Sequence, residues 1–276
     1  MATVQSLKKK LQVIRSTRKL TQAMKTASTV KYSKLSGLYS AYALYEKQYA
    51  ELYSAFGDSI GQLFADVSEN APSCYIVISS NKGMCGSFNT ELMSFFLDLI
   101  KKEEKPIVIS CGKKAEEILS KNSITAYRSY IFSDIPQYAE ANGLFNDIQA
   151  LFDEKRISSL KLVYPEYQNM IKQSPVCRDL FEGGTNGTQH KETLFVPDRE
   201  TVIKGFTQKV VPCLIYKKIL EAALGAQAAT LTTMRSAFDT ASEYCVTLEA
   251  EINRKRQSQV TADVIEVSAE YAMKGE

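Results

Sequence analysis

Apolar residues recur at alternating spacings of three and four near the C-terminus, in the stretch Leu231-Thr-Thr-Met-Arg-Ser-Ala-Phe-Asp-Thr-Ala-Ser-Glu-Tyr-Cys-Val-Thr-Leu-Glu-Ala-Glu-Ile252. This spacing is a heptad repeat, which is typical of helices that pair through one narrow apolar stripe. The residues just before it are rich in alanine, which lets a second helix approach closely. The stripe itself consists of Leu231, Met234, Phe238, Ala241, Cys245, Leu248 and Ile252.

A second heptad repeat lies near the N-terminus, where no proline occurs before Pro72. Two helices of about 60 residues would each be about 90 Å long, and neither would be stable alone with so narrow a stripe. We therefore expect them to pair as an antiparallel coiled coil; two separate helices on a compact core are the alternative. The second repeat consists of Leu35, Leu38, Tyr42, Tyr45, Tyr49, Leu52 and Phe56, with a sparser upstream part at Leu7, Leu11 and Ile14.

The residues between the two repeats alternate between short apolar runs and helical patterns. Such alternation predicts an α/β domain with a mainly parallel sheet. The expected strands are 74–80, 107–111 and 160–164, and the expected helices are 89–101, 113–120 and 139–152. A polar, glycine-rich surface loop is expected at 183–190.

The predicted fold class is α/β, with a long antiparallel coiled coil of N- and C-terminal helices and a central Rossmann-like α/β domain. We expect the N-terminal helix within 1–68, the central domain within 73–205 and the C-terminal helix within 208–276. Pro212 fits the first turn of that last helix, where its missing N–H group costs nothing.

The charge of the N-terminal helix is one-sided. Nine lysines and arginines, from Lys8 to Lys34, precede the first acidic residue, Glu46, although the net charge of the chain is only +3. This asymmetry indicates a partner with a negative surface, which could be a nucleic acid, a membrane or an acidic protein. The sequence contains no transmembrane span or secretory signal, and no transit peptide is evident.

Catalytic motifs are weak. The glycines of Ser80-Asn-Lys-Gly-Met-Cys-Gly-Ser87 follow a strand, but their spacing matches neither common phosphate-binding motif. Cys85 could act as a nucleophile with His190 as its base, yet no third group supports the pair, and a structural turn is the better interpretation. Six scattered cysteines and one histidine argue against zinc. We therefore expect no catalytic residue, no cofactor and no metal.

Two of the possible partners fit the sequence poorly. A DNA-binding basic zipper joins its basic block to a leucine-rich seam, whereas the distal seam here is rich in tyrosine. A helix that lies on a membrane needs bulky apolar residues opposite its lysines, and Leu7, Leu11 and Ile14 are too few. Nucleic-acid binding and a small-molecule enzyme that uses Cys85 remain as alternative hypotheses.

Three segments together resemble the gamma subunit of the F-type rotary ATP synthase. They are Ile14-Arg-Ser-Thr-Arg-Lys-Leu-Thr-Gln-Ala-Met24, Ser79-Ser-Asn-Lys-Gly-Met-Cys-Gly-Ser-Phe-Asn89 and Asn253-Arg-Lys-Arg-Gln-Ser-Gln-Val-Thr261. Gly112-Lys113-Lys114 also fits a family motif that follows the second strand. The segments occur in the family's order, and the resemblance covers nearly the whole chain.

The resemblance implies a non-catalytic central-stalk rotor. The coiled coil would turn inside a ring of three alpha and three beta subunits, and the α/β domain would lie near the epsilon-type subunit and the c-ring of Fo. Ion flow would drive the rotation, which changes the nucleotide affinity of each beta subunit in turn. The resemblance also implies a peripheral place on the cytoplasmic face of a bacterial inner membrane, with membrane contact only through the complex and no nucleic acid.

The family's partner contacts map onto two segments. The basic helix from Arg15 to Lys25 would face acidic loops of the beta subunits, and Arg254, Arg256 and Gln257 would form a polar catch near the top of the shaft. Past the catch, the C-terminal helix would continue into the bearing as a single helix. The expected interface residues are Arg15, Arg18, Lys19, Met24, Lys25, Arg254, Arg256, Gln257 and Thr261.

The sequence departs from the family at a few positions. Ala226 and Thr230 stand where the family has a glutamate and an arginine four residues apart. The loss of both partners removes a charge pair without leaving one charge alone, so stability need not suffer. We expect the contact with the neighbouring beta loop to differ there. A diverged gamma paralogue in a variant rotary ATPase is therefore an alternative interpretation.

Overall fold

A computed structural model describes residues 3–65, 71–101, 103, 105–180 and 198–274. Side chains are described throughout these ranges except at 46–65, 199–200, 203–204, 206–207 and 270–274. Four residues that the sequence singles out, Tyr49, Leu52, Phe56 and His190, therefore lie outside the described side chains. So does the expected loop at 183–190.

The chain forms two compact units. One consists of Met1–Ala27 with Thr233–Glu276, and the other is Ser28–Thr232. Two long helices contribute to both, α1 (Val4–Ala65) and α5 (Arg199–Lys274). The expected boundaries at 68, 73, 205 and 208 stay predictions, but α5 already begins at Arg199 and Pro212 lies inside it.

The larger unit is built on a five-stranded sheet with the order β3-β2-β1-β4-β5. The strands are β1 (Ser73–Ile78), β2 (Ile107–Cys111), β3 (Arg128–Tyr130), β4 (Ser159–Tyr167) and β5 (Gln173–Asp179). All neighbouring strands are parallel except β4 and β5, which form an antiparallel hairpin. The predicted parallel sheet is confirmed, with an antiparallel strand added at one edge.

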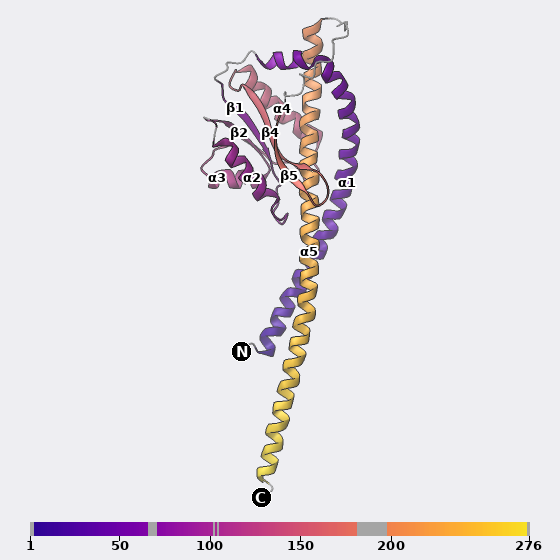
Figure 1. Ribbon diagram of the computed structural model, residues 1–276, viewed down its shortest axis with the longest axis vertical. Helices are drawn as coiled ribbons and strands as arrows, with labels where there is room; N and C mark the ends of the chain where they lie inside the picture. The colour runs from indigo at the N-terminus through magenta and orange to yellow at the C-terminus, as the bar shows by residue number, and fades with distance from the viewer. Residues whose placement is uncertain (1–2, 66–70, 102, 104, 181–197, 275–276) are drawn as a thin grey trace. The chain divides into compact units, whose positions relative to one another are not determined.

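Helices cover both faces of this sheet (Figure 1). Alternate side chains of β1 point to opposite faces, as in any strand. Tyr75 and Val77 pack with α2 (Phe88–Ile100) and α3 (Lys113–Lys121). Ile76 and Ile78 lie in a second core with α4 (Tyr138–Asp153) and the Val211–Leu224 part of α5. The expected α/β layering is therefore confirmed.

The apolar stripe of α1 differs from the predicted one in its second half. Leu35 is fully buried and lies in the sheet core, with Tyr39 and Tyr42 packed against it. Leu38 and Tyr45, which were predicted to lie in the seam, are 36% and 55% exposed. The buried stripe of α1 follows the predicted spacing as far as Leu35 and then continues to Tyr39 instead of Leu38. It does so because the sheet domain packs against the side of α1 that carries Tyr39.

The smaller unit is a pair of antiparallel helices. Its apolar seam joins Leu7 and Leu11 of α1 to Cys245, Leu248 and Ile252 of α5. Two contacts show that the helices run antiparallel. Arg15 contacts Glu249, whereas Lys25, which comes later in α1, contacts Phe238, which comes earlier in α5. Three positions of the C-terminal heptad repeat, Cys245, Leu248 and Ile252, are therefore confirmed in the seam. In the described part of the chain, no helix is long and apolar enough to cross a membrane.

Candidate functional site

Arg15 is engaged within the coiled coil. Its guanidinium donates a hydrogen bond to Glu249 Oε1 at 2.8 Å, and the two side chains are 55% and 46% exposed. An ion pair this exposed contributes little to stability, typically less than about 1 kcal/mol. Arg15 therefore stays accessible at the helix surface, and a competing acidic group could reach it.

The remaining candidate residues on α1 lie at different depths. The Lys25 ammonium lies 4.8 Å from the centre of the Phe238 ring, an attractive cation–π geometry. Lys25, Met24 and Arg18 are half-buried, whereas Lys19 is exposed. Of these side chains, Lys19 thus offers the most accessible charge, while Lys25 also helps to hold α1 against α5.

The candidate residues on α5 lie on an exposed stretch of helix. Arg254, Arg256, Gln257 and Thr261 are all exposed, and so is every residue from Arg256 to Ala269. The Thr261 hydroxyl donates to the Gln257 carbonyl at 2.9 Å, a bond within the helix. The structure therefore brings these four together on one helix, with the two arginines and the two neutral polar side chains exposed to solvent.

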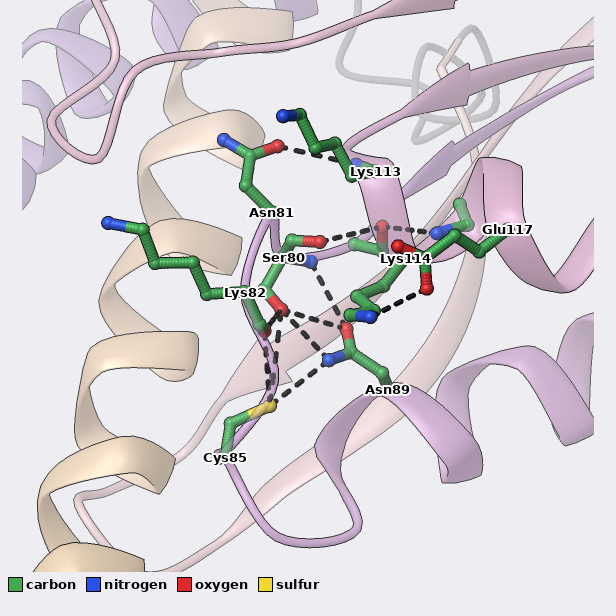
Figure 2. A network of polar contacts seen from close by, with 10 residues as sticks. Ser80, Asn81, Lys82, Cys85, Asn89, Lys113, Lys114 and Glu117 are labelled. Carbon is green, nitrogen blue, oxygen red and sulfur yellow. Dashed lines mark hydrogen bonds and ion pairs between the residues drawn. The ribbon is translucent and has the colours of Figure 1, made fainter.

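The glycine-rich loop after β1 caps α3 (Figure 2). The carboxyl ends of β1 and β2 are neighbours, since Ile78 pairs with Cys111. Successive N–H groups at the start of α3 then find partners in that loop. The N–H of Lys113 donates to Asn81 Oδ1 at 3.3 Å, that of Lys114 to the Ser80 carbonyl at 3.2 Å, and that of Ala115 to Ser79 Oγ at 2.9 Å.

This capping bears on the phosphate hypothesis. Free N–H groups at a helix N-terminus are what bind a phosphate. Here the first N–H groups of α3 are already bonded within the chain, so the loop has a structural role. Gly112 makes the turn possible, since its φ of 100° favours glycine and an added Cβ would lie 2.4 Å from the Ser79 carbonyl oxygen.

Cys85 has the surroundings of a structural thiol. It is 3% exposed, and it packs with Phe88 and Ala226. The Asn89 side-chain amide donates to its sulfur at 3.0 Å. Burial raises the pKa of the Cys85 thiol, and a nucleophilic cysteine needs the opposite shift.

Ala226 lies against the chain's own α/β domain, and Thr230 bonds to it within α5. Ala226 is 7% exposed and contacts Cys85 of the loop after β1 and Phe88 at the start of α2. The Thr230 hydroxyl donates to the Ala226 carbonyl at 2.8 Å. The absence of a charge pair is therefore accommodated by close packing of α5 on this loop.

An ion cluster joins α1 to the same edge of the sheet. Asp134 Oδ2 accepts hydrogen bonds from Lys31 at 2.5 Å and from Lys82 at 2.7 Å. The bond from Lys31, followed by that from Lys82, holds the pKa of the Asp134 carboxyl below its usual value. The sequence analysis missed this cluster, because the three residues are far apart in the chain and match no motif.

The sheet edge offers little room for a ligand. A cavity of about 50 Å³ lies between the ends of the strands and α5, lined by residues that include Ser80, Asp134 and Ala222. This volume suits a few water molecules, not a nucleotide. In the described ranges, no group of three or more histidine, cysteine, aspartate or glutamate side chains could hold a metal ion.

Comparison with known proteins decides the family. A family model described as ATP synthase matches residues 3–271. The chain belongs to the ATP synthase gamma-chain family. The gamma chain of Rubrobacter xylanophilus is 26% identical over an alignment of 282 positions, which covers 98% of this chain and 97% of that protein. The gamma chain of Leptospira biflexa is 26% identical over 285 residues, with 97% of each chain covered.

Solved structures share the fold of this gamma-family chain. One is a chain of the Euglena gracilis mitochondrial ATP synthase (OSCP, F1 and c-ring), with a TM-score of 0.70 at 16% identity over 96% of this chain and 92% of that chain. Another is a chain of the central stalk and c-ring of the Tetrahymena thermophila enzyme, with a TM-score of 0.61 at 16% identity over 79% and 99%. The predicted combination of a terminal coiled coil and a Rossmann-like domain is thus confirmed for this chain.

Proposed function

We propose that this chain is the central rotor of an F-type ATP synthase and carries out no chemistry itself. Family membership over residues 3–271 is the observation that carries the proposal. The described residues agree with it, because the loop that resembles a phosphate site is used to cap α3, and Cys85 is a buried thiol of raised pKa. A rotor acts through different contacts with each state of its partners.

The coiled coil would carry the contacts with the alpha and beta subunits. Lys19 and Arg15 present positive charge on α1, opposite the acidic loops that the family resemblance implies for the beta subunits. Met24 would lie at the sliding contact. Such exposed charges attract an acidic partner without locking it in place, because exposed ion pairs are individually weak.

The exposed end of α5 would form the catch and the bearing. Arg254, Arg256 and Gln257 have no role in the apolar seam, and Thr261 is likewise exposed. Val260 and Val264 in this exposed stretch of α5 are 53% and 58% exposed. Apolar side chains that gather on an exposed helix indicate a partner that covers them. The ring of alpha and beta subunits would supply it.

The α/β domain would transmit the load to the epsilon-type subunit and the c-ring. In this proposal the complex is peripheral to the membrane on its cytoplasmic face, and ion flow through Fo drives synthesis. The proposal involves no nucleic acid, and membership of the gamma-chain family supports a protein partner for the basic residues of α1.

Reconstitution with alpha and beta subunits tests the proposal. The isolated chain should hydrolyse no ATP, and it should copurify with the two subunits as one complex whose ATPase activity depends on it. A chain that stays apart from alpha and beta under these conditions would refute the proposal. Salt-sensitive binding to DNA or RNA at about 50 mM salt would instead favour the nucleic-acid hypothesis.

A further inference from the structure

Asp134 connects three separate parts of the larger unit. Lys31 lies on α1, Lys82 lies in the loop between β1 and α2, and Asp134 itself lies between β3 and α4. Both ammonium groups bond the same carboxylate oxygen, Oδ2. The cluster therefore joins a long helix to two loops at the carboxyl edge of the sheet.

The two lysines differ in how strongly they can attract the Asp134 carboxylate. The side chains of Lys31 and Asp134 are only 33% and 29% exposed, whereas that of Lys82 is 72% exposed. Screening by water weakens an exposed pair much more than a half-buried one. The bond between Lys31 and Asp134 is thus the stronger of the two, and it is the one that reaches α1.

This bond differs in kind from the contacts that Leu35 and Tyr32 of α1 make with the domain. Leu35 is buried in the sheet core, and apolar packing of this type resists separation without fixing a direction. The hydroxyl groups of Tyr32 and Tyr167 are 2.7 Å apart, a neutral hydrogen bond. A charge-assisted hydrogen bond is both directional and roughly twice as strong.

The facing part of α5 is held to the domain in another way. It lines the small cavity beside Asp134 with Ala222, Ala223 and Ala226, and Ala226 makes apolar contact with Phe88. Next to them, Glu221 is 3% exposed and accepts a hydrogen bond from the Tyr167 N–H at 3.1 Å. The Lys31–Asp134 pair is therefore a separate charged attachment, and it holds α1.

We propose that Asp134 is a positioning residue that clamps α1 to the α/β domain, so that helix and domain turn as one body under load. The inference rests on the proposed rotor function. A clamp of this kind matters only when torque acts between the domain and the helix. Its loss should therefore uncouple ion transport from ATP hydrolysis before it affects folding.

The test compares Asp134→Asn with a matched control in the assembled complex. Asp147 is similarly exposed at 26% and accepts two hydrogen bonds from Arg128, at 2.7 and 2.8 Å, but it joins α4 to β3 within the α/β domain. Membrane vesicles that carry each complex are assayed for ATP hydrolysis and for ATP-driven ion pumping. The ratio of the two rates measures coupling.

Asp134→Asn should lower the ratio of pumping to hydrolysis, while Asp147→Asn leaves it at the wild-type value. Loss of the charge-assisted bond should shift the balance between clamped and unclamped states roughly tenfold or more. An Asp134→Asn complex with the wild-type ratio would overturn the inference. If the wild-type complex neither assembles nor pumps, the proposed function itself fails, and the inference falls with it.

Charge exchange distinguishes clamping from simple loss of stability. Lys31→Gln should lower the coupling ratio, whereas Lys82→Gln should leave it close to wild type. In the Lys82→Gln background, Lys31→Glu combined with Asp134→Lys restores an opposite-charge pair and should restore the ratio. A combination that folds with wild-type thermal stability and still fails to restore coupling would contradict the clamp.

Discussion

Substitution of Gly112 by alanine should destabilise the larger unit strongly. Gly112 has φ 100° and ψ 144°, a region that residues with a Cβ rarely enter. The added methyl would lie 2.4 Å from the Ser79 carbonyl oxygen and 2.7 Å from Ser79 Oγ. Backbone atoms cannot rotate out of the way, so Ser79 has to shift.

The cost can be worked out from the bonds that this shift disturbs. Ser79 N donates to the Cys111 carbonyl at 2.7 Å, Gly112 N donates to the Tyr130 carbonyl at 2.8 Å, and Ser79 Oγ caps Ala115. Backbone strain adds about 1–3 kcal/mol. Loss of one of these three hydrogen bonds adds about 1 kcal/mol, so the free energy of unfolding should fall by at least about 2–4 kcal/mol.

Calorimetry or chemical unfolding of Gly112→Ala measures this loss, and a melting temperature lower by roughly 5–15 °C is expected. Gly143→Ala is the matched control, because Gly143 lies inside α4 with no atom within 4 Å of the added methyl. There the same change should stabilise by about 0.5–1 kcal/mol. A Gly112→Ala protein as stable as wild type would refute this account of the loop.

Three further results are expected. Leu248→Ala should lower the free energy of unfolding of the coiled coil by about 2 kcal/mol, whereas Val246→Ala, at a 68% exposed position of the same helix, should have little effect by chemical denaturation. Cys85 should react with iodoacetamide more slowly than an unstructured cysteine, since burial raises its pKa, and a faster rate would revive the nucleophile hypothesis. The pKa of Asp134 is lowered from 3.8, so its ion pairs stabilise the fold above that pH and are lost as the pH falls through the lowered value. The stability difference between wild type and Asp134→Asn should therefore shrink on acid titration, and a constant difference would contradict the pairing.

Periodicity was sufficient for the elements with one clear apolar pattern. Cys245, Leu248 and Ile252 of the C-terminal heptad repeat lie in the seam of the coiled coil, and the run Ile107–Cys111 is β2 with the same bounds. On α1, two apolar patterns are possible, and both include Leu35 and Tyr42. The predicted pattern passes through Leu38, and the one in the structure passes through Tyr39. Tyrosine and leucine suit both, so the packing of the sheet domain decides between them.

The missed features depend on contacts between distant segments. β3 has three residues and little burial, and β5 contains Pro175, which edge strands tolerate but which argues against a strand in a sequence. The capping of α3 requires β1 and β2 to end side by side, which no local pattern reveals. The pairing of Lys31 with Asp134 arises in the same way.

The central claim is that the chain rotates within a ring of alpha and beta subunits, and single-molecule observation tests it most directly. A complex of the chain with alpha and beta subunits is fixed through the ring, and a bead is attached to the α/β domain. The account predicts rotation in one direction when ATP is added, with torque lowered by Arg254→Glu combined with Arg256→Glu while the chain stays folded. A bead that remains still while the same complex hydrolyses ATP would contradict the account.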